Sequence, residues 1–307
     1  MPHGWIILDK PLGLGSTQAV GAVKRNLREA GLGKIRTGHG GTLDPLATGV
    51  LPIAIGEATK LTGQMLDSDK AYDFTIGFGS QTDTLDAEGE VIATSDHLPV
   101  LGDIEAVLGE FSGLIEQMPP AYSALKVDGR RAYDLARAGE DVVLKPRAVV
   151  VHGLSIGPVA PVSAGIEGAH DERIAHVTLT ANVSKGTYIR SLARDIALAL
   201  GSVGHVTMLR RTRAGPFSLE QAISLDKLNE IGKGAALEDI ILPMEAGLDD
   251  IPALALSSDQ ARRLRQGQVV IGFAEDDGRY WAREGNLPIA LVELEAGEAR
   301  VIRGFNL

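Results

Sequence analysis

The chain has 307 residues, of which 44% are hydrophobic and 23% are charged, and its formal net charge is −10. This length and composition are typical of a globular protein with one large domain and one small one. The absence of cysteine excludes disulfides, thiolate zinc sites and cysteine nucleophiles. Because the sequence has neither an apolar run long enough to cross a membrane nor the pattern of a secretory leader, we expect a cytoplasmic protein.

The charges are unevenly distributed along the chain. Residues 67–110 hold eleven Asp or Glu against one Lys, whereas residues 185–213 hold six Lys or Arg against one Asp. The acidic total argues against a polyanionic partner, but a basic surface formed by the second segment would permit contact with RNA. Two ordinary solvated surfaces would explain the same pattern, so the charges permit RNA binding without showing it.

The first predicted elements are a strand, a glycine loop and a helix. GWIILDKP is a short apolar run closed by Pro11, and STQAVGAVKRNLREAG has apolar residues at helical spacing up to Gly31. Neither the Walker A pattern nor the GxGxxG pattern occurs here, so we expect Ser16 to act as an ordinary helix N-cap. The glycine-rich segment GHGGTLDPLATG then leads into VLPIAI, a predicted buried strand.

Further along, a hairpin, two short helices and a strand are predicted. KAYDFTIGFGSQTDTLDAEGEVI is typical of a hairpin with an acidic turn, DIEAVLGEF of a short helix starting near Asp103, and RRAYDLARAG of a helix up to Gly139. Between Arg173 and Val183 apolar and polar residues alternate, which predicts a half-buried strand. The loop SKGT then joins this strand to YIRSLARDIALALG, a predicted amphipathic helix.

The last part of the chain differs in pattern. After the breaker-rich segment LPMEAGLDDIP come the short strand-like runs QVVIGFA, YWARE and IALVELEAG. We therefore predict a large first domain over residues 1–236 and a small β-rich domain over residues 251–307.

Asp44 is the first candidate for chemistry. It lies between Leu43 and Pro45 and follows the side-chain-poor stretch 38–41, so a substrate could approach its carboxylate closely. A lone Asp before a Pro also commonly starts a turn. The local spacing leaves both interpretations open.

Five segments resemble the TruB family of pseudouridine synthases, in the family's order. They are LDKPLGLGST, GHGGTLDPLATGVLPIAIGEATKL, KAYDFTIGFGSQTDTLDAEGE, PPAYSALKVDGRRAYDLAR and SKGTYIRSLARDIALALGSVGHVTMLRR. The resemblance implies an α+β catalytic core with a mostly antiparallel sheet flanked by helices, and a small PUA-like C-terminal domain. It also implies an enzyme that isomerises uridine 55 in the T-loop of tRNA without a metal or organic cofactor.

The resemblance assigns three residues to the chemistry. Asp44 is the nucleophile, Arg190 the cation that keeps it charged, and Tyr72 the aromatic residue that stacks on the target base and handles the proton at C5. A free aspartate has a pKa of about 3.9, so it is ionised at neutral pH without a general base. Without the resemblance, Arg190 could equally be an exposed helix-start residue and Tyr72 a strand core residue.

Other residues would open and hold the RNA. A uridine stacked in a loop has to be flipped out before a side chain can reach its ring, and His39 matches the family histidine that inserts into the T-loop. No second and third ligand stand at a suitable spacing for His39 to bind a metal. Tyr188 and Leu209 match pocket walls, although both could be core residues. Candidate phosphate contacts, all of them cations, are Lys10, Lys126, Arg130, Arg131, Lys185, Arg210 and Arg211.

We expect tRNA as the partner, bound by its T-arm and by its acceptor end at the C-terminal domain, to a monomer without an obligate protein partner. Three alternatives remain. The first is the guide-RNA-dependent branch of the same superfamily. The second is a tRNA-folding chaperone, an activity that can coexist with catalysis. The third is a metabolic enzyme with an acidic surface.

Overall fold

The computed structural model describes residues 2–123, 125–127, 129–140, 144–157, 162–163, 173–232, 235–249 and 251–307. The chain forms two compact units that do not follow its order in sequence. Unit 1 comprises Met1–Leu43, Gly49–Leu66 and Ala214–Leu307, and unit 2 comprises Asp44–Thr48 and Asp67–Arg213. The domains predicted from the sequence, 1–236 and 251–307, divide the chain differently and stay a prediction.

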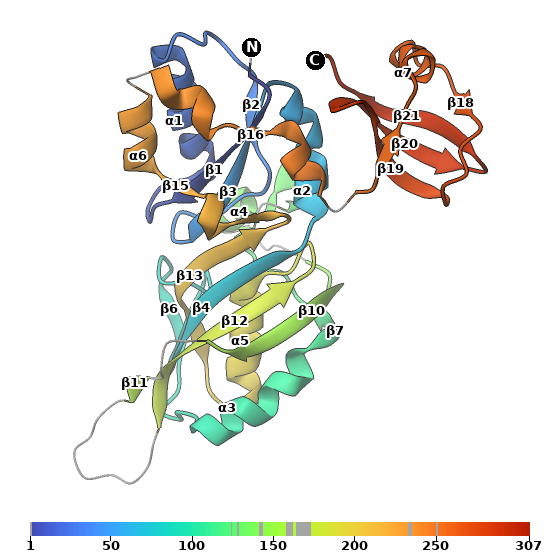
Figure 1. Cartoon of the computed structure of the whole chain (residues 1–307). Helices are drawn as coiled ribbons and strands as arrows, with labels where there is room; N and C mark the ends of the chain where they lie inside the picture. Colours follow the sequence, from blue (N-terminus) through green and yellow to red (C-terminus); the bar gives the residue numbers. More distant parts are fainter. Residues whose placement is uncertain are drawn as a thin grey trace. The chain divides into compact units, whose positions relative to one another are not determined.

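The first part of unit 1 is a sheet with helices α1 and α6 beside it (Figure 1). Strand β1 pairs antiparallel with β3 and β16 and parallel with β15, and β2 pairs antiparallel with β3. The bounds are β1 (Gly4–Lys10), α1 (Ser16–Glu29), β2 (Thr37–His39), β3 (Thr48–Ile55), α2 (Thr62–Asp67), β14 (Phe217–Ser218), β15 (Ile223–Ser224), α6 (Leu225–Ile231) and β16 (Leu242–Pro243). The strands predicted from GWIILDKP and VLPIAI are confirmed, and so is the helix between them.

The core of unit 1 is built around Trp5. Its ring is fully buried with its centroid 5.3 Å from that of Phe217, and its indole Nε1 donates a hydrogen bond to the Met244 carbonyl at 3.1 Å. A Cβ on Gly247 would lie 2.7 Å from the Trp5 ring, so only glycine leaves room for the indole there. Leu291 of the C-terminal part belongs to the same apolar cluster, which ties that part to β1.

The C-terminal part of unit 1 is β-rich, as predicted. Its five strands pair in the order β17-β19-β20-β21-β18, and α7 packs against β20. The bounds are β17 (Ala253–Ala255), α7 (Ser258–Arg265), β18 (Val270–Ile271), β19 (Gly278–Glu284), β20 (Leu287–Glu295) and β21 (Glu298–Gly304). Helix α7 is absent from the sequence-based prediction, although Ser257 and Gln260 form a capping box, a pattern typical of a helix N-terminus. No helix among the described residues is long and apolar enough to cross a membrane.

Unit 2 contains a mostly antiparallel sheet in the order β13-β4-β12-β10-β7, which agrees with the predicted α+β class. The bounds are β4 (Lys70–Phe78), β5 (Ser80–Thr82), β6 (Val91–Thr94), α3 (Leu101–Val107), β7 (Gly113–Gln117), β8 (Lys126–Val127), β9 (Arg130–Arg131), α4 (Ala132–Arg137), β10 (Arg147–Ile156), β11 (Val162–Ser163), β12 (Ile174–Val183), α5 (Ile189–Ala199) and β13 (Gly204–Ala214).

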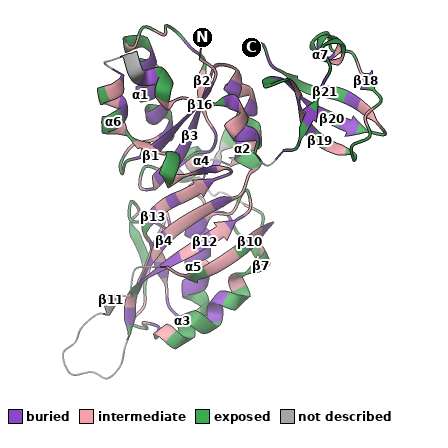
Figure 2. Cartoon of the chain, in the orientation of Figure 1, coloured by how far each residue is buried: buried purple, intermediate pink, exposed green. Residues whose placement is uncertain are grey.

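Strand β12 and helix α5 confirm two predictions. Along β12 the apolar residues except Ala175 are buried, and most polar ones are partly or fully exposed (Figure 2). Thr178 is an exception that is buried, because its hydroxyl bonds to that of Thr75 across the β4–β12 pair at 2.8 Å. The apolar stripe of α5 faces the core, and Gly201, just beyond its end, has a φ of 70°.

The predicted hairpin at 70–92 is wrong in its pairing. Strand β4 does not pair with β6; it lies between β12 and β13, and the acidic turn joins the much shorter β5 and β6 instead. The physical reason is burial: β4 carries Phe74 and Ile76 into the core, whereas β6 exposes Val91 and Ile92. The acidic turn is therefore not the tip of a long hairpin, and its Leu85 and Asp86 are buried.

We expect Phe217→Ala to lower the free energy of unfolding by about 3–5 kcal/mol, because it leaves a cavity against the Trp5 ring. Ile271→Ala is the matched control, since Ile271 is exposed and its truncation should cost well under 1 kcal/mol. Urea denaturation followed by tryptophan fluorescence measures both. Equal losses in the two variants would contradict the central place of this aromatic pair.

Candidate active site

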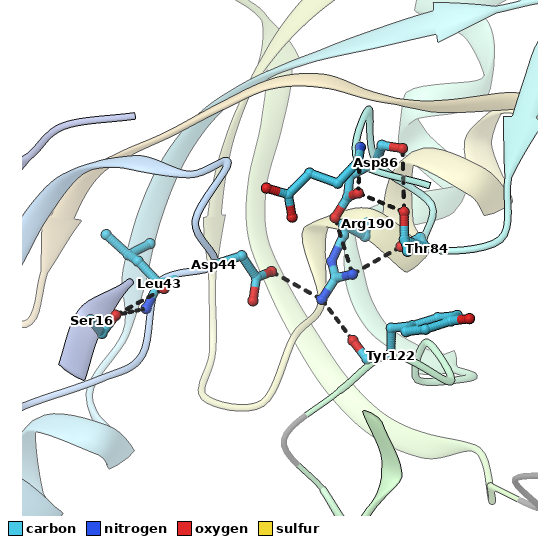
Figure 3. A network of polar contacts seen from close by, with 8 residues as sticks. Ser16, Leu43, Asp44, Thr84, Asp86, Tyr122 and Arg190 are labelled. Carbon is cyan, nitrogen blue, oxygen red and sulfur yellow. Dashed lines mark hydrogen bonds and ion pairs between the residues drawn. The ribbon is translucent and has the colours of Figure 1, made fainter. Parts of the chain in front are cut away.

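A buried arginine in unit 2 lies between two carboxylates (Figure 3). Arg190, near the start of α5, contacts Asp44 Oδ2 through Nη2 at 3.0 Å and Asp86 Oδ2 through Nη1 at 3.2 Å. The same two nitrogens donate hydrogen bonds to the backbone carbonyls of Tyr122 and Thr84, each at 2.9 Å. Four oxygen atoms, two from carboxylates and two from backbone carbonyls, therefore fix the orientation of the guanidinium.

The two carboxylates differ in exposure. The Asp44 side chain is 40% exposed, whereas those of Asp86 and Arg190 are 4% and 8% exposed. Among the described residues, Arg190 is the partner of the Asp44 carboxylate, and it engages only Oδ2. Asp44 thus presents its second oxygen to solvent while the first is held by a cation.

The backbone around Asp44 positions its side chain. Its carbonyl accepts a hydrogen bond from the Ala47 amide at 3.0 Å, so Asp44 does start a turn, but by its main chain and not by its carboxylate. The preceding residue, Leu43, is anchored by Ser16, whose hydroxyl bonds to both the amide and the carbonyl of Leu43 at 2.8 Å. Ser16 is therefore not the predicted N-cap. The cap is Gly15, and Ser16 begins α1 with its hydroxyl turned to the loop.

The acidic turn after β5 supplies Asp86. Its Oδ1 accepts hydrogen bonds from the Thr84 hydroxyl at 2.6 Å and from the Glu88 amide at 3.1 Å, which leaves Oδ2 for Arg190. Leu85 has a φ of 63°, a conformation that costs a non-glycine residue about 1–2 kcal/mol. It is held there because its side chain is buried and its carbonyl accepts from the Val206 amide at 3.0 Å. In sequence, the strained Leu85 lies between Thr84 and Asp86, both of which contact Arg190.

Tyr188 precedes α5 and is held by two elements of the sheet. The buried Gln117 of β7 donates to its carbonyl at 3.0 Å and accepts from its amide at 2.7 Å. The Arg147 guanidinium of β10 lies over the ring, 4.6 Å from its centroid. The tyrosine that was predicted to line the pocket thus has a fixed backbone and a covered face.

The other two predicted pocket residues lie on neighbouring strands. Tyr72 is half-buried on β4 opposite Ala181, on the face that carries Phe74. Leu209 is buried on β13. Among the described residues, neither side chain takes part in the Asp44–Arg190–Asp86 network, so their predicted contacts with a base stay predictions.

His39 belongs to unit 1. It is half-buried at the end of β2, opposite Ile53 of β3, and the next amide, that of Gly40, donates to the Pro52 carbonyl at 2.8 Å. A Cβ on Gly40 would come within 2.5 Å of the Met65 side chain, so the glycine after His39 lets the chain pass close to α2. The insertion of His39 into RNA stays a prediction.

The candidate phosphate contacts fall into three groups. Lys10 and Arg211 are 0% and 1% exposed, and Lys10 Nζ donates to the carbonyls of Pro11 and Leu14, so neither presents a cation at the surface. Arg130 and Lys185 are exposed but paired with Glu140 and Asp67, and Arg210 contacts the Thr48 hydroxyl. The side chains of Lys126 and Arg131 lie outside the described part of the chain.

Sequence reasoning missed Asp86, Gln117 and Arg147. Asp86 lies in the acidic turn that the sequence shows, but nothing local distinguishes it from the other carboxylates of that turn. Gln117 ends the short and mostly exposed strand β7, so nothing in the local pattern indicates that its side chain is buried and hydrogen-bonded. In the described residues, no group of three or more His, Asp or Glu side chains is arranged to hold a metal ion.

Lys70, the first residue of β4, is a buried amine within two residues of Tyr72. Burial, and after it the charge of Arg211, lowers its pKa to about 8, against the opposing effects of Asp67 and Asp69. Its Nζ donates a hydrogen bond to the Ser68 carbonyl. The folded protein therefore favours the neutral form of this lysine more than the unfolded chain does.

Two family models match the chain. The model described as TruB family pseudouridylate synthase (N terminal domain) covers residues 27–189, and that described as tRNA pseudouridylate synthase B C-terminal domain covers residues 190–249. The tRNA pseudouridine synthase B of Novosphingobium aromaticivorans is 64% identical over all of this chain and 98% of its own, and that of Zymomonas mobilis is 57% identical over 99% and 96%.

Solved structures share the fold. An archaeal box H/ACA sRNP Nop10-Cbf5 complex contains a chain with a TM-score of 0.72 and 24% identity, over 99% of this chain and 86% of that one. An H/ACA RNP bound to a substrate RNA containing 2'-deoxyuridine gives 0.71 and 23%, over 99% and 85%.

Lys70 makes unfolding depend on pH in a defined direction. Between its folded pKa of about 8 and the ordinary lysine value of 10.5, the unfolded chain binds more protons than the folded one, so stability rises with pH. We expect the unfolding free energy of the wild type, relative to Lys70→Met, to rise by up to roughly 3 kcal/mol between pH 7 and 10.5. Urea denaturation at several pH values measures it. A flat difference would contradict the burial of this charge.

Proposed function

Because the chain belongs to the TruB family of pseudouridine synthases, we propose that it isomerises uridine 55 in the T-loop of tRNA, with Asp44 as the nucleophile. The observation that carries this proposal is the contact of Arg190 with Asp44 at 3.0 Å, in a network that leaves one Asp44 oxygen toward solvent. The tRNA substrate itself rests on the relatives, which are named for it.

The geometry suits attack by a carboxylate. The reaction breaks the N1–C1′ bond of uridine, turns the uracil and joins C5 to C1′; C5 loses its proton, N1 gains one, and there is no net oxidation. Asp44 can add to the substrate through Oδ1 while Arg190 holds Oδ2, so the carboxylate keeps its orientation as its charge changes. The half-exposed Asp44 needs no general base, which fits the absence of one from its contacts among the described residues.

Arg190 depends on Asp86 for its own position. Of its two carboxylate partners, Asp44 is 40% exposed, whereas Asp86 is 4% exposed and is thus the partner that is as buried as the guanidinium itself. Asp86 is nearly fully buried and is held by Thr84 and Glu88, so it can act only through Arg190 and not on a substrate. We assign it as a positioning residue.

The uridine has to leave its stack to reach Asp44, and we propose His39 as the residue that enters the RNA loop in its place. Tyr72 would stack on the flipped base and take part in proton transfer at C5, and Tyr188 and Leu209 would line the pocket. The fixed backbone and covered ring of Tyr188 support a preorganised wall. We also propose that the C-terminal sheet touches the acceptor end, as a PUA-like domain would.

The alternatives differ in what the protein needs. The H/ACA neighbours share the fold at 23–24% identity, which says nothing of guide RNA here, whereas the 64% identical relative is named as a tRNA enzyme. We therefore propose a stand-alone monomeric enzyme that can also remodel tRNA. A metabolic enzyme with an acidic surface would lack the steep salt dependence that phosphate contacts give to tRNA binding.

Purified protein should convert one uridine per unmodified tRNA transcript, and Asp44→Asn should lower this turnover by on the order of 10³-fold or more, while the tRNA Kd changes less than about threefold. Release of tritium from [5-³H]uridine tRNA measures turnover, and filter binding measures Kd. Asp103→Asn, the same change on the exposed side of α3, is the control. Retained turnover in Asp44→Asn would disprove the nucleophile, and no product from the wild type would disprove stand-alone activity.

Asp86→Asn should lower kcat by about 10- to 100-fold with little change in KM, because Arg190 loses a charged partner but the RNA surface is unaltered. Asp83→Asn is the matched control in the same turn. Asp83 accepts a hydrogen bond from the Glu90 amide at 2.9 Å and has no contact with Arg190. If both variants show the same kcat, Asp86 does not position Arg190.

A further inference from the structure

A basic pocket lies in unit 1, outside the residues assigned to catalysis. It has a volume of about 370 Å³, and its lining residues come from α1 and from the segment that enters β2. These two elements pack against each other. Lys24 and Arg28, one helical turn apart on α1, line one side. Lys34 and Arg36, from the segment that leads into β2, line the other. Four cations therefore surround one cavity in a protein whose formal net charge is −10.

These cations have no acidic neighbour in the pocket. Its other lining residues are Ile35 and Thr37, and no ion pair within the described residues involves any of the four. Arg28, Lys34 and Arg36 are exposed, and Lys24 is half-buried. Four like charges around one cavity repel one another, and this repulsion is relieved when an anion binds.

Thr37 provides an independent observation. Its hydroxyl oxygen is buried and has no hydrogen-bond partner in the described structure, and it belongs to the lining of the same pocket. Buried hydroxyls are nearly always hydrogen-bonded, so an unpartnered one beside a cavity indicates a missing acceptor or donor. An oxyanion bound beside Thr37 would supply the missing acceptor once the hydroxyl turns toward the cavity, and its charge would offset those of the lysines and arginines.

We propose that this pocket binds phosphates of the RNA backbone. Unit 1 would thus contact the tRNA whose uridine reacts at Asp44 of unit 2. The choice of RNA rests on the function proposed above and on the position of His39. His39 lies two residues beyond Thr37 on β2, about 7 Å along the strand. If His39 enters an RNA loop, the phosphodiester backbone of that loop comes within reach of the pocket. Binding of a free phosphate compound would not require the pocket to lie close to His39.

The test removes charge from the pocket and compares it with charge removed from the same helix. Arg28→Ala and Lys34→Ala, alone and together, neutralise exposed cations of the pocket. Arg25→Ala is the matched control, because Arg25 lies on α1 but contacts Asn229 and Glu29 instead. Filter binding of an unmodified tRNA transcript between 50 and 200 mM KCl gives both Kd and its salt dependence.

The double variant should bind tRNA roughly tenfold more weakly at 100 mM salt, and the slope of log K against log salt should become shallower by about 1 for each phosphate that the pocket no longer binds. Thr37→Val, which removes only the hydroxyl, should weaken binding by a few-fold with an unchanged slope. A double variant that matches Arg25→Ala in both Kd and slope would overturn the proposal.

A second arm separates RNA from free phosphate. Inorganic pyrophosphate is titrated into the wild type and the double variant, and thermal unfolding is followed. If the double variant loses stabilisation by pyrophosphate but keeps the tRNA affinity of Arg25→Ala, the pocket serves a free phosphate compound and the RNA assignment is overturned. Failure of the proposed function is distinct, since it would appear as tRNA binding without pseudouridine formation by the wild type.

Discussion

The structure of unit 2 around its site depends on one buried cation. Arg190 can be buried because two carboxylates and two backbone carbonyls surround it, and these come from three separate segments of the chain. A guanidinium in this setting is costly to leave uncompensated, so the loop of Asp44, the acidic turn and the segment of Tyr122 all have to meet α5. The same requirement gives Asp44 a fixed direction while it keeps contact with solvent.

The scaffold around this network is built mainly from backbone contacts. Ser16 holds the main chain of Leu43, Gln117 holds that of Tyr188, and Val206 holds that of Leu85. Such contacts fix the main chain next to Asp44 and Asp86 and just before Arg190 without using the side chains of these three residues. They also explain why the loop before Asp44 can be poor in side chains without losing its position.

Acidic and basic side chains gather at different places in the two units. In unit 2 the acidic turn has Asp86 turned inward to Arg190, whereas its Glu88 and Glu90 are exposed. In unit 1 the cations of α1 and the following loop collect around one pocket, although the chain as a whole is acidic. Net charge is therefore a poor guide to polyanion binding here, because the relevant quantity is the local arrangement of charges.

Much of the fold could be predicted from the sequence, since hydrophobic periodicity records burial directly. The alternation along β12, the apolar stripe of α5 and the short strands of the C-terminal part all appear where their patterns place them. The pairing of β4 could not be predicted, because a strand chooses its partners by the burial of Phe74 and Ile76 against distant strands and not by its neighbour in sequence. For the same reason the sequence predicts phosphate contacts for Lys10 and Arg211, whereas the structure buries both side chains.

The site divides in the same way. Sequence by itself determined the family, through the ordered segments that include Asp44 and Arg190, and left open whether that aspartate was a turn residue. Only the tertiary structure decided that its backbone makes the turn while its carboxylate meets Arg190, that Asp86 is the second carboxylate, and that Lys24, Arg28, Lys34 and Arg36 share a cavity. These residues are distant in sequence or indistinguishable from neighbours of the same charge, and their roles arise from proximity, which residue patterns do not record.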